Sequence, residues 1–356
     1  MYKRITAWAF FAAVASAAVA TTAASSWRDV LDTPAAKSPL ASRALLNGLA
    51  YAGQRIVAVG QRGHVLLSDD GGKSWQQAAV PVSSDLVAVS FPSATTGWAV
   101  GHDGVVLKSS DAGATWTRQL DGNTAGATMV DYYGRGAARD ADPRRVEAAA
   151  EEAKRFAAQG AENPFLDVWF EDDKSGFVVG AFGLILRTTD GGSTWEPWLH
   201  AIDNPKAQHL YAVRGVGTDV YITGEQGLVL KLDRAAGRFL ALEVPYKGTL
   251  FGVTGNSHAV VVHGLRGTVL RSADGGRSWQ AVSTNLQVGL TASTVDASNR
   301  ILIVSQSGHV LTSTDDGASF KPVRIERPAP AAAVLALGHA AVVVAGPRGV
   351  QSQSLQ

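Results

Sequence analysis

A repeated unit of about forty residues constrains the fold of this chain more than any other feature. Each unit carries an apolar run that leads into Gly-x-x-Gly, as in "WAVGHDGVVLKS", and this marker begins at residues 60, 101, 180, 224, 264, 305 and 346. The successive spacings are 41, 79, 44, 40, 41 and 41. Four short strands in each unit of this length are typical of a β-propeller blade. We therefore predict an all-β, seven-bladed β-propeller with four-stranded blades.

A second marker in most units has the form Ser/Thr-x-Asp-Gly-Gly-x-Ser/Thr-Trp. Its copies are "SDDGGKSW", "SSDAGATW", "TTDGGSTW", "SADGGRSW" and "STDDGASF", and "LDRAAGRF" is a degenerate copy. An aspartate in such a turn accepts hydrogen bonds from the following N–H groups and from the hydroxyl two residues before it. We expect this structural role for five aspartates, namely Asp70, Asp111, Asp190, Asp274 and Asp315. Because they lie on different blades, they cannot form the close carboxylate pair of a glycosidase.

The seventh unit stops after its third strand, at "GVQSQSL". The segment "SSWRDVL", residues 25–31, is similar to fourth strands such as "ATWTRQL". We therefore predict that an N-terminal strand completes the last blade and closes the ring, which would remove an open sheet edge.

The long spacing of 79 residues indicates an insertion, residues 122–163, between blades 2 and 3. Asp142 as a cap, Pro143 at the first helical position and Gly160 as a stop predict one helix within it. The preceding stretch "MVDYYGRG" is predicted to be a loop or a short strand.

The N-terminus has the pattern of a secretory signal peptide. Lys3 and Arg4 precede an apolar stretch, and small residues follow it, so cleavage is expected after residue 20 or 24. We predict a signal peptide over residues 1–24 and a mature propeller over 25–356, exported to a periplasm or, in a photosynthetic cell, to the thylakoid lumen. The sequence contains no cysteine, which excludes disulfides, and no later apolar run is long enough to span a bilayer.

Charge and motifs exclude several classes of function. The 32 basic and 31 acidic residues argue against general nucleic-acid binding, which needs a basic surface. The histidines do not form a spaced metal motif, and the sequence has neither a GxSxG nor a Walker loop. The Asp-Gly turns also lack the terminal glutamate of a calcium loop. We expect no catalytic residue, metal site or cofactor.

Strand alternation places the Gly-x-x-Gly turns and the insertion on one face of the ring. The variable residues of these turns, on a rigid frame, suit recognition of a protein partner, although ordinary solvated turn residues would show the same polarity. The candidate partner contacts are Arg62, His102, Tyr132, Tyr133, Arg135, Phe182, Glu225, Arg266 and Arg348.

The opposite face carries basic residues just before the hydroxyl of the Asp turn, namely Lys108, Arg187, Lys231 and Arg271. Two interpretations remain open for this basic arc. The long stems could pack between blades with their charged ends near the turns, or the arc could bind an acidic protein segment.

The Ser/Thr-x-Asp-Gly-Gly-x-Ser/Thr-Trp marker resembles the Asp-box, or BNR, repeat. Sialidases carry this repeat, but their Arg-Ile-Pro start is absent here. Because the repeat is shared, a glycoside hydrolase or a carbohydrate-binding propeller stays an alternative. In a carbohydrate-binding propeller, Trp98, Trp169 and Trp198 would stack on sugars.

Unit length, blade number, the export signal and the basic arc more closely resemble the Ycf48/HCF136 family of photosystem II assembly factors. This resemblance implies a non-catalytic propeller that binds an assembling membrane protein and maps a basic patch onto the arc. The client would be a photosystem II-like complex or, in a bacterium without photosystems, an RND/MMPL-type transporter.

Overall fold

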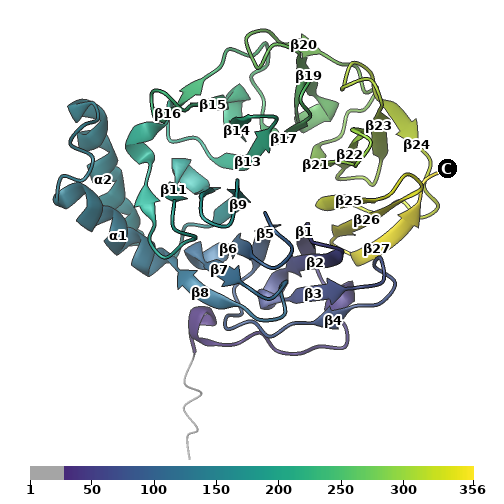
Figure 1. Cartoon of the computed structure of the whole chain (residues 1–356), viewed down its shortest axis with the longest axis horizontal. Helices are drawn as coiled ribbons and strands as arrows, with labels where there is room; N and C mark the ends of the chain where they lie inside the picture. Colours follow the sequence, from purple (N-terminus) through teal and green to yellow (C-terminus); the bar gives the residue numbers. More distant parts are fainter. Residues whose placement is uncertain (1–27) are drawn as a thin grey trace, which may run out of the picture.

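The computed structural model describes residues 28–356. The predicted signal peptide, residues 1–24, lies outside these described residues. Seven antiparallel sheets surround a central channel, as Figure 1 shows. Within the described range, six sheets have four strands and the last has three. The prediction of a seven-bladed propeller is confirmed.

Each blade runs from an inner strand at the channel to an outer strand at the rim (Figure 1). Blade 1 contains β1 (Leu46–Ala52), β2 (Arg55–Gly60), β3 (Val65–Ser68) and β4 (Gln76–Gln77). Blade 2 contains β5 (Leu86–Ser90), β6 (Gly97–Gly101), β7 (Val106–Ser109) and β8 (Thr117–Leu120). Blade 3 contains β9 (Phe165–Phe170), β10 (Gly176–Gly180), β11 (Ile185–Thr188) and β12 (Glu196–Pro197).

The remaining blades repeat this order. Blade 4 contains β13 (Leu210–Val216), β14 (Asp219–Gly224), β15 (Val229–Asp233) and β16 (Arg238–Ala241). Blade 5 contains β17 (Leu250–Gly255), β18 (Val260–Gly264), β19 (Val269–Ser272) and β20 (Gln280–Ala281). Blade 6 contains β21 (Leu290–Val295), β22 (Ile301–Ser305), β23 (Val310–Ser313) and β24 (Lys321–Val323). Blade 7 contains β25 (Ala333–Leu337), β26 (Ala341–Gly346) and β27 (Gly349–Ser354).

A β-bulge near the start of the inner strand recurs in blades 1 to 6. In blade 4 the pairing register shifts between Leu210 and Ala212, and in blade 5 it shifts between Leu250 and Gly252. A bulge turns one extra residue away from the regular ladder. The six bulged residues line the channel, and they are Asn47, Val87, Leu166, Tyr211, Phe251 and Thr291.

The insertion contains two helices, α1 (Gly122–Gly134) and α2 (Pro143–Gln159). The Asp142 cap, the Pro143 start and the Gly160 end of α2 are confirmed. The prediction of a loop or short strand for "MVDYYGRG" is wrong, because α1 runs through its first part. Asp121 and Thr124 form a reciprocal capping box at the start of α1, and this local signal stabilises the helix.

The two helices pack against the outside of the ring beside blades 2 and 3 (Figure 1). Met129 and Phe156 are buried in one hydrophobic cluster with Trp195 of blade 3. Arg145 of α2 also donates to His200 O at 3.0 Å and to Asp203 Oδ1 at 3.0 Å. The insertion is therefore packed firmly against the outer side of blades 2 and 3.

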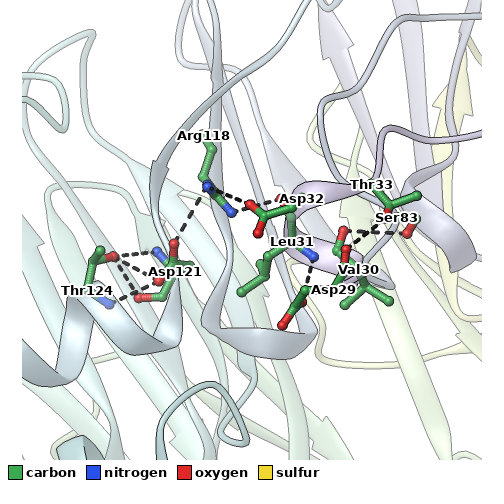
Figure 2. Close-up of polar contacts among 9 residues, drawn as sticks. All are labelled: Asp29, Val30, Leu31, Asp32, Thr33, Ser83, Arg118, Asp121 and Thr124. Atoms are coloured by element: carbon green, nitrogen blue, oxygen red, sulfur yellow. Dashed lines mark hydrogen bonds and ion pairs between the residues drawn. The ribbon is translucent and has the colours of Figure 1, made fainter. Parts of the chain in front are cut away.

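The prediction that residues 25–31 form the fourth strand of blade 7 is wrong for its described part. Val30–Asp32 form a short 3₁₀ helix that the Asp29 side chain caps. Figure 2 shows this helix against blade 2, where Arg118 donates to Leu31 O at 2.8 Å and Ser83 donates to Val30 O at 2.8 Å. Leu31 is buried there, so its apolar side chain fixes the segment away from blade 7.

The ring closes instead through direct packing of blade 1 on blade 7. Leu46 and Ile56 share a hydrophobic cluster with Val343 and Ala345. The Tyr51 hydroxyl donates to Ala336 O at 2.6 Å across the same boundary. Blade 7 consequently keeps three strands among the described residues. As for membrane spans, no helix within residues 28–356 has both the length and the apolar character to cross a bilayer.

Candidate interaction surface

The Gly-x-x-Gly turns present an exposed ring of side chains on one face. In blades 1 to 5 the third residue of the marker, a non-glycine residue, has a positive φ between 52° and 58°. Such a conformation is uncommon for side chains other than glycine, asparagine and aspartate. These residues are Arg62, Asp103, Phe182, Gln226 and Arg266. All but the half-buried Asp103 are exposed, so the turn conformation directs variable side chains outward.

An aromatic row leads from this turn face into the channel. Phe182 is 44% exposed, and its ring lies 4.7 Å from that of His209, between ring centroids. His209 lies 6.3 Å from Tyr211, and Tyr211 lies 5.5 Å from Phe251. We call Phe182, His209, Tyr211 and Phe251 the aromatic rim. It spans blades 3 to 5 and offers the rigid, amphipathic side chains that dominate protein interfaces.

Polar contacts hold the aromatic rim in place. The backbone N–H of Phe182 donates to His209 Nδ1 at 2.7 Å, so the neutral His209 ring carries its proton on Nε2. Glu225 Oε2 accepts a hydrogen bond from the backbone N–H of His209 at 2.9 Å. Arg155 of α2 places its guanidinium carbon 5.7 Å from the Phe182 ring centroid. The insertion thus contributes a cation to the edge of this surface.

The channel opens beside the aromatic rim as a cavity of about 710 Å³. Its charged lining residues are Asp85, Asp167 and Arg214, and His102 and His263 also reach it. Asp167 is almost fully buried and accepts from the Arg214 guanidinium and from Val213 N. Burial raises the pKa of the Asp167 carboxyl, and the Arg214 charge opposes that rise.

His263 reaches the channel wall from the second strand of blade 5. A Cβ on Gly252 would lie 2.5 Å from the His263 ring, so the glycine provides the space for this ring. His263 Nδ1 donates to Leu290 O at 3.1 Å, and Nε2 accepts from the Ser293 hydroxyl at 2.9 Å. Burial lowers the pKa of His263 to about 4, so the ring joins blades 5 and 6 in its neutral form.

This buried histidine predicts an acid-sensitive fold. The folded-state pKa of about 4 lies below the value of 6.5 for a histidine in the unfolded chain, so the stabilisation is complete above pH 6.5. It is lost as the pH falls from 6.5 toward 4, because the unfolded chain binds the proton first, and about 3 kcal/mol is at stake. We expect urea midpoints measured between pH 7.5 and 4.5 to fall steeply for the wild type and less steeply for His263→Gln. Equal slopes for both proteins would contradict this assignment.

The structure distributes the sequence-predicted partner contacts unevenly. Arg62, His102, Arg266 and Arg348 are exposed on the turn face, and Glu225 is half-buried beside the aromatic rim. Arg135 is exposed just after α1.

Tyr132 and Tyr133 of α1 are predicted partner contacts, which requires exposed rings, but neither residue is exposed. Tyr133 is only 7% exposed and bonds His200 Nδ1 at 3.0 Å, while Tyr132 is half-buried and packs edge-on against Tyr133. Helix α1 turns both residues toward blade 3, so the expectation of exposed aromatics here is wrong.

Sequence reasoning missed His209, Tyr211 and Phe251. The signal was present, because Tyr211 and Phe251 each follow the buried leucine that starts an inner strand. In a regular strand the side chain at this position would point into the packing between neighbouring blades. The bulge instead directs it into the channel.

The Asp-box turns have the geometry of self-contained structural turns. Asp70 Oδ1 accepts from Ser68 Oγ at 2.8 Å and from Ser74 N at 2.9 Å, and its Oδ2 accepts from Ser74 Oγ at 2.5 Å. The same contacts recur around Asp111, Asp190, Asp274 and Asp315. Hydrogen bonds from Ser319 and Ser313 lower the pKa of Asp315 to about 2. The carboxylate oxygens of all five aspartates therefore accept hydrogen bonds from residues of their own turns.

Three residues of the basic arc reach from one blade to the Asp-box turn of the next. Lys108 Nζ donates to Gly191 O at 2.9 Å, Lys231 Nζ donates to Gly275 O at 3.1 Å, and Arg271 Nε donates to Asp316 O at 2.7 Å. Arg187 lies over the Trp198 ring at 4.8 Å. All four residues are half-buried, and the charged ends of Lys108, Lys231 and Arg271 connect neighbouring blades.

The tryptophans considered for sugar stacking are mainly core residues. Trp98 is fully buried and stacks on Phe170, with centroids 3.5 Å apart, and Trp198 is 7% exposed. Trp169 is half-buried. The expectation that Trp98 and Trp198 present their faces to a ligand is wrong, because both fill space between or behind strands. Among residues 28–356, no three His, Asp or Glu side chains gather as a metal site.

Known proteins resemble this chain in both sequence and fold. Residues 21–132 and 147–247 match the family model described as "Photosynthesis system II assembly factor YCF48". The "Photosystem II assembly lipoprotein Ycf48" of Synechococcus sp. (strain CC9902) is 32% identical over 129 residues, which cover 35% of this chain and 38% of that relative. The chain thus spans well under half the length of this curated relative.

Two solved structures share the architecture. "YCF48 bound to D1 peptide" matches with a TM-score of 0.63 and 14% identity, covering 88% of this chain and 94% of that chain. "Streptogramin B lyase structure" matches with a TM-score of 0.63 and 11% identity, covering 88% and 95%. At these identities the likeness concerns the fold alone, which enzymes and non-enzymes share. The family model, however, covers more than half of the sequence. The chain therefore belongs to the YCF48 family of photosynthesis system II assembly factors.

Proposed function

We propose that this protein is an exported, non-catalytic platform that binds a segment of a membrane protein during assembly of a complex. The turn face around the aromatic rim is the binding surface in this proposal. The observation that carries it is the continuous row from the exposed Phe182 to Phe251 at the channel mouth. Family membership supports the assembly role, and a relative with this fold is described as bound to a D1 peptide.

The surface chemistry favours an extended segment with apolar side chains. Leu265, which is 37% exposed, lies on the blade 5 turn beyond the aromatic rim, and Arg155 and Arg266 supply cations at its edges. Aromatic and arginine side chains at one site are typical of the strongest contacts in interfaces. The formal charge balance makes nucleic acid an unsuitable partner.

The client is a photosystem II-like complex or an RND/MMPL-type transporter in this proposal. The predicted signal peptide supports an encounter in a periplasm or thylakoid lumen. The competing role is a glycoside hydrolase or carbohydrate-binding propeller. The buried Trp98 and Trp198 disfavour carbohydrate stacking, and the five Asp-box carboxylates are held by their own turns.

We expect Phe182→Glu combined with Tyr211→Ala to reduce capture of a membrane client roughly tenfold or more, because it removes central aromatic contacts. The measurement is affinity capture from detergent-solubilised membranes of the native host, with the captured proteins identified by mass spectrometry. The matched control is Leu40→Ala, since Leu40 is 60% exposed but is not part of the aromatic rim.

A second variant tests the Asp-box face without breaking inter-blade contacts. Lys73→Glu with Arg277→Glu reverses two exposed charges at the same position of two boxes. If this variant loses the client while the rim variant keeps it, the proposed face is wrong. Hydrolysis of sialosides or other glycosides with ordinary turnover would overturn the non-catalytic role.

A further inference from the structure

Blade 7 ends in an unusually long outer strand. The outer strands of blades 1 to 6 contain two to four residues, whereas β27 contains six. Short edge strands limit pairing with other chains, and a long edge strand is a template for such pairing. The segment from Gly349 to Gln356 also contains no charged residue or proline that would block a neighbour.

The outer backbone edge of β27 forms no hydrogen bond to another strand of the described chain over most of its length, although Gly349, Val350 and Gln353 are buried. Within the described chain, β27 pairs only with β26, and no backbone hydrogen bond outside the sheets involves residues 349–354. The linker from blade 6 covers only the end, where Gln356 N donates to Arg324 O at 3.0 Å and Leu355 bridges to Ile325. Figure 1 shows β27 at the rim of the ring, on the side opposite the two helices.

A groove lies where a fourth strand would run. It is a cavity of about 720 Å³ between the linker residues Glu326–Ala329 and β27 residues Gln351–Ser354. The Gln353 side chain donates to Arg327 O at 2.8 Å and joins the two walls. The groove therefore has a strand edge with main-chain hydrogen-bonding groups along one side.

The charges around this groove are mainly positive and favour an acidic occupant. Arg324, Arg327 and Arg348 are exposed, and no ion pair within residues 28–356 involves any of them. Glu326 is the one acidic residue that lines the groove. A strand that carries carboxylates would neutralise this excess of positive charge.

We propose that β27 is a strand-addition site for an extended acidic segment of a partner protein. Main-chain hydrogen bonds to β27 complete the fourth strand of blade 7, and the arginines select carboxylate side chains. This site is separate from the aromatic rim and does not depend on the role proposed for that surface.

Two other occupants fit the structure less well. Residues 28–43 of this chain run from blade 2 along blade 1, and only the 3₁₀ helix Ala41–Arg43 abuts the start of β27, at Gly349. A second copy that paired β27 with β27 would bring two sets of the same three arginines together, which like-charge repulsion disfavours.

Binding of a labelled peptide tests the proposal. The probe is a fluorescein-labelled hexapeptide of alternating glutamate and valine, and fluorescence anisotropy measures its affinity for the mature protein. We expect Arg327→Glu with Arg348→Glu to weaken binding roughly tenfold or more, because attraction becomes repulsion. Arg144→Glu is the matched control, since Arg144 is exposed on α2 and forms no ion pair with any residue from 28 to 356. Thermal melts verify that all variants are folded.

Further outcomes decide the mechanism. A version of the peptide with N-methylated alternate amides should lose binding if the strand pairs through its main chain. Equal binding of a lysine–valine peptide, or no effect of the double reversal, would overturn the proposal. It would also be overturned if the wild type forms a dimer that Ser352→Pro dissociates, or if residues 1–27, when present, block the peptide by occupying the edge themselves.

Discussion

Replacing Gly267 by alanine is expected to lower the free energy of unfolding by more than about 3 kcal/mol, a large effect for a single methyl group. Gly267 is the last glycine of the blade 5 turn and has a φ of +75°. An added Cβ would lie 2.1 Å from Leu286 O and 2.7 Å from Leu286 C, which belong to the inter-blade linker. Backbone atoms cannot move away without loss of the packing between blades 5 and 6.

The matched control is Gly71→Ala. Gly71 has nearly the same φ, +72°, but no atom lies within 4 Å of its added Cβ. This variant should lose only about 1 kcal/mol, the usual penalty for a left-handed alanine. Urea denaturation followed by tryptophan fluorescence measures both. Equal losses for the two variants would show that close approach to the linker does not explain the glycine.

Replacing Arg214 by methionine is expected to cost about 3–5 kcal/mol at pH 7, because it leaves the Asp167 carboxylate buried without its partner. Asp167 has a side chain only 4% exposed, and burial already raises its pKa. Without Arg214 the folded-state pKa of Asp167 rises further above the value of an aspartate in the unfolded chain. The variant therefore keeps stability below the unfolded pKa and loses it as the pH rises through the folded pKa, so its deficit should shrink in acid.

Two controls separate the buried charge from the loss of a side chain. Asp167→Asn combined with Arg214→Met should recover much of the stability at pH 7, since the unpaired charge is gone. Arg234→Met removes an exposed pair with Glu171, whose side chains are 52% and 48% exposed, and should cost at most about 1 kcal/mol. A deficit in Arg214→Met that is independent of pH would contradict the role assigned to Asp167.

The local elements of the fold were predictable because their signals lie within one unit. The Asp-box hydrogen bonds join residues two to four positions apart, so the marker reads directly as a turn. The ends of α2 follow from Asp142, Pro143 and Gly160, which act on their own backbone. Helix α1 had a local signal as well, in the capping box of Asp121 and Thr124, but glycines and a double tyrosine obscured its periodicity.

The candidate site was less predictable because it depends on contacts between units. Phe182 was identified from its place in a turn, whereas His209, Tyr211 and Phe251 form a row only because bulged strands of blades 4 and 5 meet it at the channel. Tyr133 was chosen as an aromatic residue in an insertion, but the docking of α1 on blade 3 buries it.

The sequence by itself determined the number of blades, the order of strands and the position of the insertion, since each is encoded by a repeat that specifies its own turns and apolar runs. Only the tertiary structure decided how the ring closes. The end segment around Leu31 gains burial against blades 1 and 2, and blade 7 is left with β27 as its outer edge. That choice depends on the free energy of competing long-range contacts, which a local pattern does not encode.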